Sequence, residues 1–414
     1  MQMDFEQLPG QIIDFILFFI PFAVFYALIV FIYKTWVDFA QTKFEASQKK
    51  VLLRIYPPKL VTKTPAAMEL FLNALYQKGG EATWYDKKVL GKKRAVFSLE
   101  IASHSGEVAF YIRTRSGMRR EVETQIYAQY PGIEVVESED YVDKVNLEEC
   151  GAFGVEFMLT GADPLPIKTY VDYGLDKPAE EEEKIDPITN TLELLGALKK
   201  GENMWIQIIT KAHVKEDQDP ESWFGKVDNW QEEAKELIKK IREKSAPENA
   251  DGTPGFPNPT KGEIEKINAI ERSVSKFGFD CGIRGMYIAK KDVFEGTSIG
   301  TLINAFKQYN SLSLNGFKPQ NHTGTDYPWQ SWFGNPSIRM VKQMYDDYKA
   351  RSYFGTTFVG INYFGFSKWK DRQKFILNAE ELATIYHFPG QSANTPSLKR
   401  VQSRKGEAPE NLPI

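Results

Sequence analysis

The sequence has few of the residues that build catalytic and metal sites. Only two cysteines, Cys150 and Cys281, occur in 414 residues, and they lie far apart, so neither a zinc site nor a disulfide framework is indicated. The four histidines are scattered singly, without the i, i+4 spacing by which a helix presents two imidazoles to a metal. We therefore expect no metal and no cofactor.

Nucleotide-binding motifs are also missing. The chain contains no G-x-x-x-x-G-K-[ST] phosphate loop and no G-x-G-x-x-G sequence, which argues against an ATPase. A formal net charge of −3 gives no global attraction to nucleic acid. The sequence thus predicts a protein that is not an enzyme; an active site whose residues meet only in space is the weaker alternative.

The longest apolar run lies near the amino terminus. IIDFILFFIPFAVFYALIVFIY covers residues 12–33, with Asp14 as its only charge. As a helix rising about 1.5 Å per residue, this run is long enough for the ~30 Å hydrocarbon layer of a bilayer. A buried core helix is the alternative, but soluble helices are rarely apolar on every face for this length. We expect the spanning residues to include Phe15, Phe19, Pro21, Phe25, Leu28 and Phe31.

Charge sets the expected orientation of this span. No lysine or arginine precedes it, whereas Lys34, Lys43 and Lys49 follow it. The positive-inside rule then predicts that the amino terminus lies outside and that the bulk of the chain is cytoplasmic. We therefore expect a single-pass protein of the cell inner membrane.

The remainder of the chain is predicted to have an α+β fold. Alternating apolar residues predict strands, and apolar residues at helical spacing predict helices from Pro65 and around 118–130. The predicted strands are 51–55, 95–102, 106–114 and 133–137. The order strand, helix, strand, strand, helix, strand is that of a ferredoxin-like (βαββαβ) sandwich.

The same order recurs less clearly between residues 150 and 320, where PIKTYVDY (166–173) is the first predicted strand. An insertion at 226–276 contains two charged helices joined by a turn-rich segment, which predicts a helical hairpin. An apolar stripe on its second helix is a candidate partner contact and consists of Ile264, Ile267, Ile270 and Val274. Packing of the pair onto its own sheet explains the stripe equally well.

These patterns divide the chain into six parts. They are an N-terminal segment with a transmembrane helix (1–34), a juxtamembrane linker (35–50), a first ferredoxin-like module (51–145), a second module (150–320) with its hairpin, a C-terminal helix and aromatic segment packing on the body (321–390), and a flexible tail (391–414). Asn378, with Glu381 three residues later, predicts a capping box at the start of a helix in the fifth part. The acidic run at 180–183 is interpreted as a solvated linker.

Two surface features could bind nucleic acid. Arginines cluster where a predicted strand meets a predicted helix, and a helix amino terminus attracts phosphate. The candidate phosphate contacts are Arg113, Arg115, Arg119 and Arg120, with a solvated loop as the alternative. The aromatic residues between 329 and 369 could stack bases, but packing is the favoured use because few basic residues lie among them.

Two stretches resemble a known family. VLLRIYPPK through VVESEDY, residues 51–141, resembles the region ahead of the motor in membrane-associated HerA-like DNA-transfer ATPases of the conjugation and type IV secretion kind. NAEELATIYHFPGQ through NLP, residues 378–413, is similar to the segment that leads into their ATPase core. The motor's phosphate loop is expected after Pro413, where the chain stops, so no catalytic residue is carried over.

The resemblance implies a scaffold or docking subunit without ATPase activity. Its expected partners are the lipid bilayer, a separate HerA-like ATPase or another secretion subunit, and further copies of the chain. An uncharacterised bacterial membrane protein that reuses the module is a second interpretation. A membrane-tethered nucleic-acid-binding protein, using the arginines at 113–120 and the aromatic segment, is the alternative function.

Overall fold

The structure is a computed structural model that describes residues 8–58, 61, 63–81, 83–177, 185–214, 228–246, 256–324, 336–354, 374–390, 398 and 400. Three predicted features lie outside these residues: the acidic run at 180–183, most of the aromatic segment and most of the tail. The chain divides into two compact units, each described by itself. We call residues 1–49 with 79–94 the anchor unit, and residues 50–78 with 95–414 the sheet unit.

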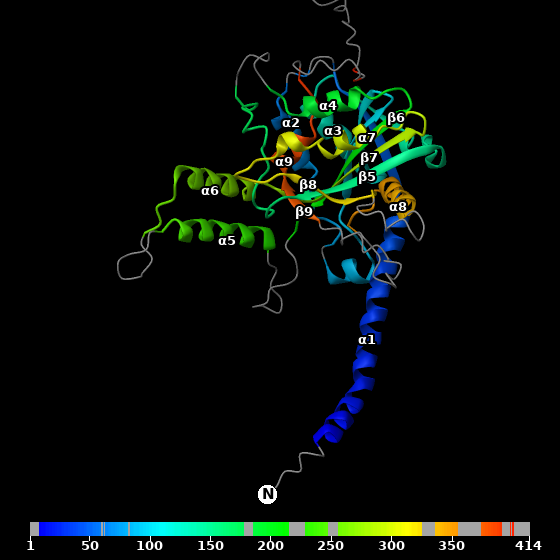
Figure 1. The fold of residues 1–414 in the computed structure, drawn as a ribbon, viewed down its shortest axis with the longest axis vertical. Coiled ribbons are helices and arrows are strands. Elements are labelled where there is room, and N and C mark those ends of the chain that lie inside the picture. Colours follow the sequence, from blue (N-terminus) through cyan, green and yellow to red (C-terminus); the bar gives the residue numbers. More distant parts are fainter. Residues whose placement is uncertain are drawn as a thin grey trace, which may run out of the picture. The chain divides into compact units, whose positions relative to one another are not determined.

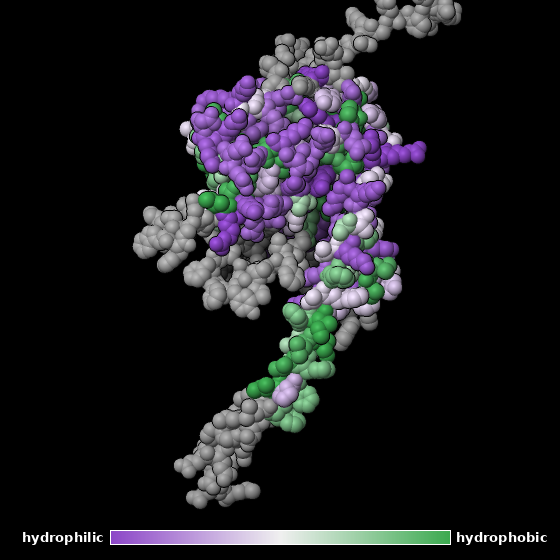
Figure 2. Space-filling model, turned by 90° about the vertical axis from the view of Figure 1, so that its right-hand side faces the viewer, coloured by the Kyte–Doolittle hydropathy of each residue, from purple (hydrophilic) through white to green (hydrophobic). Residues whose placement is uncertain are grey.

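The anchor unit contains one long helix, α1 (Leu8–Ser47), which confirms the predicted apolar helix. From Phe18 onward, α1 is long and apolar enough to cross a membrane. Its apolar surface is the green column in Figure 2. Among the predicted spanning residues, Pro21 lies inside the helix, the side chain of Phe15 is outside the described part, and the exposed ones are Phe19, Phe25, Leu28 and Phe31.

The sheet unit is built on one antiparallel sheet of nine strands, so the predicted α+β class is confirmed. Eight strands follow the order β4-β1-β3-β2-β6-β7-β5-β8, and β9 pairs with β7. The strands are β1 (Lys50–Tyr56), β2 (Val96–His104), β3 (Glu107–Arg115), β4 (Glu134–Ser138), β5 (Cys150–Leu159), β6 (Glu202–Ala212), β7 (Gly278–Lys290), β8 (Phe317–His322) and β9 (Phe375–Asn378). The first four confirm the strands predicted at 51–55, 95–102, 106–114 and 133–137.

The sheet consists of two halves with the same internal order. In the first half, β3 lies between β1 and β2, and β4 lies on the other side of β1. In the second half, β7 lies between β5 and β6, and β8 lies on the other side of β5. Pairing of β2 with β6, from Val96 opposite Lys211 to His104 opposite Asn203, joins the halves. The sequence thus encodes one continuous sheet.

Helices cover both faces of this sheet (Figure 1). The helices are α2 (Pro65–Ala74), α3 (Arg119–Gln129), α4 (Ile188–Gly196), α5 (Asn229–Lys244), α6 (Lys261–Val274), α7 (Gly296–Ile303), α8 (Pro336–Ala350) and α9 (Ala379–Ile385). The main core lies on one face, where α2, α3, α4, α7 and α9 pack over alternate strand residues such as Leu53, Leu99, Ile206 and Ile283. A smaller core on the other face holds Trp205 under Tyr348 of α8.

The prediction of a strand at 166–173 is wrong. This segment pairs with no strand and forms turns. The Asp172 and Tyr173 N–H groups bond to the Thr169 carbonyl within a turn, and other backbone donors bond to side chains. The Ile167 N–H donates to the Glu381 carboxylate, and the Tyr170 N–H donates to the Thr384 hydroxyl. The first strand of the second half is β5, and its last strand is β8; neither was predicted from the sequence pattern.

The predicted helical hairpin is present as α5 and α6, inserted between β6 and β7. Thr260 begins α6 with a capping box, and Asp228 caps α5 by accepting from the Gln231 N–H. Ala234 of α5 and Ile270 of α6 are buried together against Leu165 of the body. The two helices of the hairpin therefore pack against each other, and one end of the hairpin packs on the rest of the sheet unit.

The segment 375–389 belongs fully to the core, since every residue in it is buried. Replacing Leu382, which is completely buried on α9, by alanine is expected to lower the free energy of unfolding by about 2–5 kcal/mol through lost contacts and a cavity. Chemical denaturation of the detergent-solubilised full chain measures this change. Leu312→Ala, at a fully exposed position, is the matched control and should shift stability by less than about 0.5 kcal/mol. If both variants change the free energy of unfolding by the same small amount, the placement of α9 in the core is wrong.

Candidate functional site: a polar cluster at the start of helix α9

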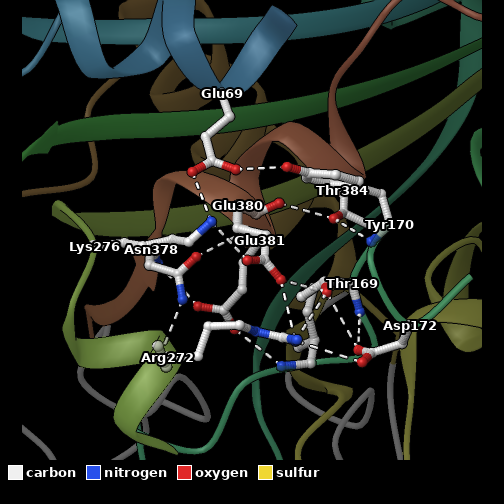
Figure 3. Close-up of polar contacts among 12 residues, drawn as sticks. Glu69, Thr169, Tyr170, Asp172, Arg272, Lys276, Asn378, Glu380, Glu381 and Thr384 are labelled. Atoms are coloured by element: carbon white, nitrogen blue, oxygen red, sulfur yellow. Dashed lines mark hydrogen bonds and ion pairs between the residues drawn. The ribbon is translucent and has the colours of Figure 1, made fainter. Parts of the chain in front are cut away.

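Helix α9 begins inside a cluster of polar side chains that come from four segments far apart in the sequence (Figure 3). Glu69 comes from α2, and residues 169–172 come from the turn segment that precedes α4. Residues 272–276 come from the end of α6, and residues 378–384 from β9 and α9. We call these residues the α9 clamp, because their contacts hold the hairpin and the C-terminal segment to the body.

The predicted capping box at Asn378 is confirmed. The Asn378 side chain accepts from the Glu381 N–H, and the Glu381 carboxylate accepts from the Asn378 N–H, both at 2.9 Å. The other Glu381 oxygen accepts from the Ile167 N–H, also at 2.9 Å. Burial raises the pKa of Glu381 to about 8, although these backbone donors act in the opposite direction.

Glu380 is the centre of the charged contacts. Its carboxylate lies 2.7 Å from Lys276 Nζ and 3.2 Å from Arg272 Nη2, and the Thr169 hydroxyl donates to it at 2.5 Å. Lys276 Nζ also lies 2.7 Å from the Glu69 carboxylate. Burial by itself lowers the pKa of Lys276, but the bonds to Glu380 and Glu69 outweigh it and the pKa is raised. Both basic residues are thus paired with carboxylates of the body.

Further bonds close the cluster around these charges. Arg272 also lies 3.4 Å from Asp172. The Tyr170 hydroxyl donates to Glu69 at 2.7 Å, and the Asn378 side-chain amide donates to the Ser273 hydroxyl at 3.0 Å. The polar groups of the α9 clamp thus contact mainly one another and join four segments of the chain.

A second buried cluster ties α8 to the opposite face of the sheet. Glu100 on β2 is completely buried and receives two bonds from Arg351, at 2.9 and 3.0 Å, and one from the Tyr141 hydroxyl at 2.7 Å. Burial opposes ionisation of Glu100, but the adjacent Arg351 cation lowers the pKa of this carboxyl overall. Arg351 follows α8 in the left-handed region, with φ of 54°. This geometry fixes the end of α8 on β2.

The four predicted arginines do not converge on one site. The charge of Arg119 is engaged by two carboxylates, those of Glu123 and Glu137. Arg113 is half-buried on β3 and donates to the Ala350 carbonyl at 3.3 Å, and burial lowers its pKa.

Arg115, also on β3, is half-buried, whereas Arg120 in the first turn of α3 is exposed. Of the four candidate phosphate contacts, Arg120 is therefore the one whose side chain lies openly at the surface.

The predicted apolar stripe on α6 lies mainly inside the hairpin. Ile267 and Ile270 are buried, with 6% and 0% of their surface exposed, and Val274 is half-buried. Only Ile264 has a large exposed fraction, 45%. The packing interpretation thus accounts for most of the stripe.

One motif with catalytic associations, G-x-S-x-G, occurs at residues 296–300. Ser298 lies in the first turns of α7, not in a tight strand-to-helix elbow. Its hydroxyl is 3.5 Å from Glu202, a carboxylate that also accepts from the Tyr287 hydroxyl at 2.6 Å. No histidine bonds to Ser298 in the described part of the chain. Among these residues there is also no group of three or more metal-ligating side chains.

A family model described as a domain of unknown function, DUF8128, matches residues 37–401. The chain belongs to the DUF8128 family. A comparison with curated proteins gives no match. The DUF8128 match begins inside α1, just after its apolar run, and covers the nine strands, the hairpin and the α9 clamp. The description of the DUF8128 family assigns no activity.

The α9 clamp was not predicted from the sequence beyond its capping box. Glu69 and Arg272 lie on helices that are each predicted correctly, and Lys276 lies just after the second of these helices, but no local spacing links the three residues. The one signal that the sequence of the DUF8128 domain offers is Glu380, an acidic residue that follows an N-cap and precedes an apolar helix face.

Removing one cation from the α9 clamp should destabilise the protein. Lys276→Ala is expected to lower the free energy of unfolding by about 1–3 kcal/mol, because Glu380 is left as a buried carboxylate with fewer partners. Denaturant titration of the full chain in detergent provides the measurement. The control is Lys239→Ala on α5, an exposed lysine 3.7 Å from Glu243, which should change stability by about 0.5 kcal/mol or less. If both variants behave alike, the clamp does not hold the hairpin base.

Proposed function

We propose that this protein is a non-enzymatic scaffold, anchored in the cell inner membrane by α1, that docks a HerA-like ATPase of a conjugation-like or type IV secretion machine. The amino terminus lies outside and the sheet unit lies in the cytoplasm. The apolar surface of α1 and the basic residues that follow it support the anchoring and the orientation. The sequence resemblance at 51–141 and 378–413 supports the choice of partner.

The main support for the docking role is the structure of the hairpin. Its base is fixed by Arg272 and Lys276 in the α9 clamp, while most of its surface is exposed. On α5, only Trp230 and Ala234 are buried. A rigidly based pair of helices with an exposed, charged surface is suited to presenting a docking face, because little conformational entropy is lost when a partner binds.

We also propose that each half of the sheet is a ferredoxin-like unit. Support comes from the element order β1-α2-β2-β3-α3-β4 and its counterpart β5-α4-β6-β7-α7-β8. In both halves the third strand lies between the first two, as a split βαβ arrangement requires. Two such units in one sheet give a rigid platform from which the hairpin extends. Further copies of the chain around a ring-shaped motor are part of the proposal.

The nucleic-acid-binding alternative is less well supported by the geometry. Two carboxylates already engage Arg119, and Arg113 is half-buried against the end of α8. Phosphate binding depends on cations that can approach a backbone of closely spaced charges. A single exposed arginine, Arg120, supplies little of that attraction.

The docking role is tested by removing the hairpin. A full-length variant in which residues 229–274 are replaced by a short glycine-serine linker is purified in detergent with a tagged HerA-like ATPase from the same cell. We expect the ATPase to be recovered with the unmodified chain and lost with the variant. The control is a double variant, Glu236→Lys with Lys240→Glu. It exchanges the charges of an exposed pair, whose Lys240 Nζ and Glu236 carboxylate lie 3.6 Å apart, and leaves the hairpin in place. Undiminished recovery after hairpin removal would refute this docking role.

A further inference from the structure

The segment 79–94 leaves the sheet unit between α2 and β2 and belongs to the anchor unit with α1. Its short helix, η1 (Tyr85–Val89), lies beside α1 in Figure 1. Gly91 has φ of +64°, and a Cβ there would lie 2.2 Å from the backbone carbon of Ala40. The two backbones are therefore in direct contact, and only glycine permits this approach. We call residues 79–94 the foot.

The foot exposes large apolar side chains. Trp84 is 66% exposed, Tyr85 57% and Leu90 42%. On α1, Trp36 and Phe39 are 52% and 60% exposed. Exposed tryptophan and tyrosine close to the end of a membrane-spanning helix are typical of the membrane interface, where their amphipathic rings lie among the headgroups.

The foot is also basic. KKVLGKKR, residues 87–94, holds five cationic side chains. Arg94 is buried and lies 3.1 Å from Glu81, and Lys92 lies 2.8 Å from Asp86, so the segment keeps an excess of positive charge after these two ion pairs. Lys88 Nζ lies 5.9 Å from the ring centre of Tyr33, the last residue of the apolar run. Lysines close to the surface of an anionic leaflet each contribute attraction to its headgroups.

The point at which the foot contacts α1 fits the binding of lipid headgroups. Ala40 is seven residues beyond Tyr33, so Gly91 contacts α1 roughly 10 Å past the apolar run at the helical rise of about 1.5 Å per residue. The headgroup region of a bilayer extends roughly 5–8 Å beyond each side of its hydrocarbon core. Gly91 thus contacts α1 just beyond this layer, whereas Lys88 of η1 reaches back to Tyr33 at its inner boundary, so η1 lies alongside the headgroups.

We propose that the foot binds the anionic phospholipid headgroups of the leaflet from which α1 emerges, with Trp84, Tyr85 and Leu90 in the interface and the lysines at the phosphates. This inference rests on the proposed membrane anchoring by α1. It gives the anchor unit a second attachment to the membrane besides α1. Docking of a partner protein on the same surface is the competing outcome.

The test places an environment-sensitive NBD fluorophore on the full chain in nanodiscs. Leu90→Cys labels the foot, Phe25→Cys labels the middle of the apolar run, and Leu312→Cys labels an exposed position of the sheet unit. Cys150→Ser removes the more accessible native thiol, while the fully buried Cys281 stays. Iodide quenching is compared in phosphatidylcholine and in phosphatidylcholine with phosphatidylglycerol.

We expect the label at 90 to be shielded from iodide with phosphatidylglycerol and more accessible with phosphatidylcholine alone. The label at 25 should be shielded in both, and the label at 312 in neither. If the label at 90 is as accessible as the label at 312 while the label at 25 is shielded, lipid binding by the foot is refuted and anchoring by α1 is not. Accessible labels at both 25 and 90 would overturn the anchoring as well. Shielding at 90 that does not depend on lipid would indicate a protein contact and would also overturn the proposal.

A glycine pair supplies a matched control. Gly91→Ala forces the foot away from Ala40 and should abolish the lipid-dependent shielding at 90 without changing the label at 25. Gly79→Ala, in the same segment but with open space around the new Cβ, should retain it. Full shielding in Gly91→Ala would contradict the attachment of the foot to α1.

Discussion

The pairing of β2 with β6 is the constraint on which the sheet unit depends. Each of these strands would be the open edge of its own half, with unpaired backbone groups and apolar side chains such as Leu99 and Ile206. An exposed edge of this kind recruits other chains. Pairing the two edges with each other satisfies the backbone groups and lets one core run beneath both halves. The two repeats are stable together because each covers the vulnerable side of the other.

The two insertions are connected in sequence to the strands of this central pair. The foot precedes β2, and the hairpin follows β6; Val96 and Lys211, near those two points, are opposite one another in the register. The α9 clamp then fixes the hairpin with buried charges, and Glu100 fixes α8 on the other face. A buried charge is stable only when it is paired, so these contacts favour one position for each helix. The sheet unit is thus a single platform whose helices are held at defined positions.

Local patterns in the sequence predict local structure well. Alternation around Ser105 and Gly106 predicts the β2 and β3 hairpin, whose turn residues have φ of 53° and 86°. Asn378 and Glu381 predict the cap of α9, which is present. The apolar run predicts α1. In each case the determining residues lie within a few positions of one another, so periodicity or capping is sufficient.

Contacts between distant segments could not be predicted in the same way. Ile167, Thr169 and Val171 alternate as a strand would, yet their segment forms turns, and side chains of α9, more than 200 residues later, accept from its backbone donors. The charges of Glu69 and Lys276 predict that these residues need polar partners if they are buried, but not which residues those partners are. Likewise, the apolar residues of β2 and β6 predict that each is a buried strand, but not that the two strands are neighbours. These choices depend on the assembled core.

The most direct test of this account is hydrogen exchange on the full chain in nanodiscs, followed at the amides of β2 and β6. A single platform predicts that residues 97–103 and 204–210 exchange among the slowest in the protein, at the free energy of global unfolding. The edge strands β4 and β8 should exchange faster. If β2 and β6 exchange early while β3 and β7 stay protected, the halves separate from one another, and the account of one continuous sheet is wrong.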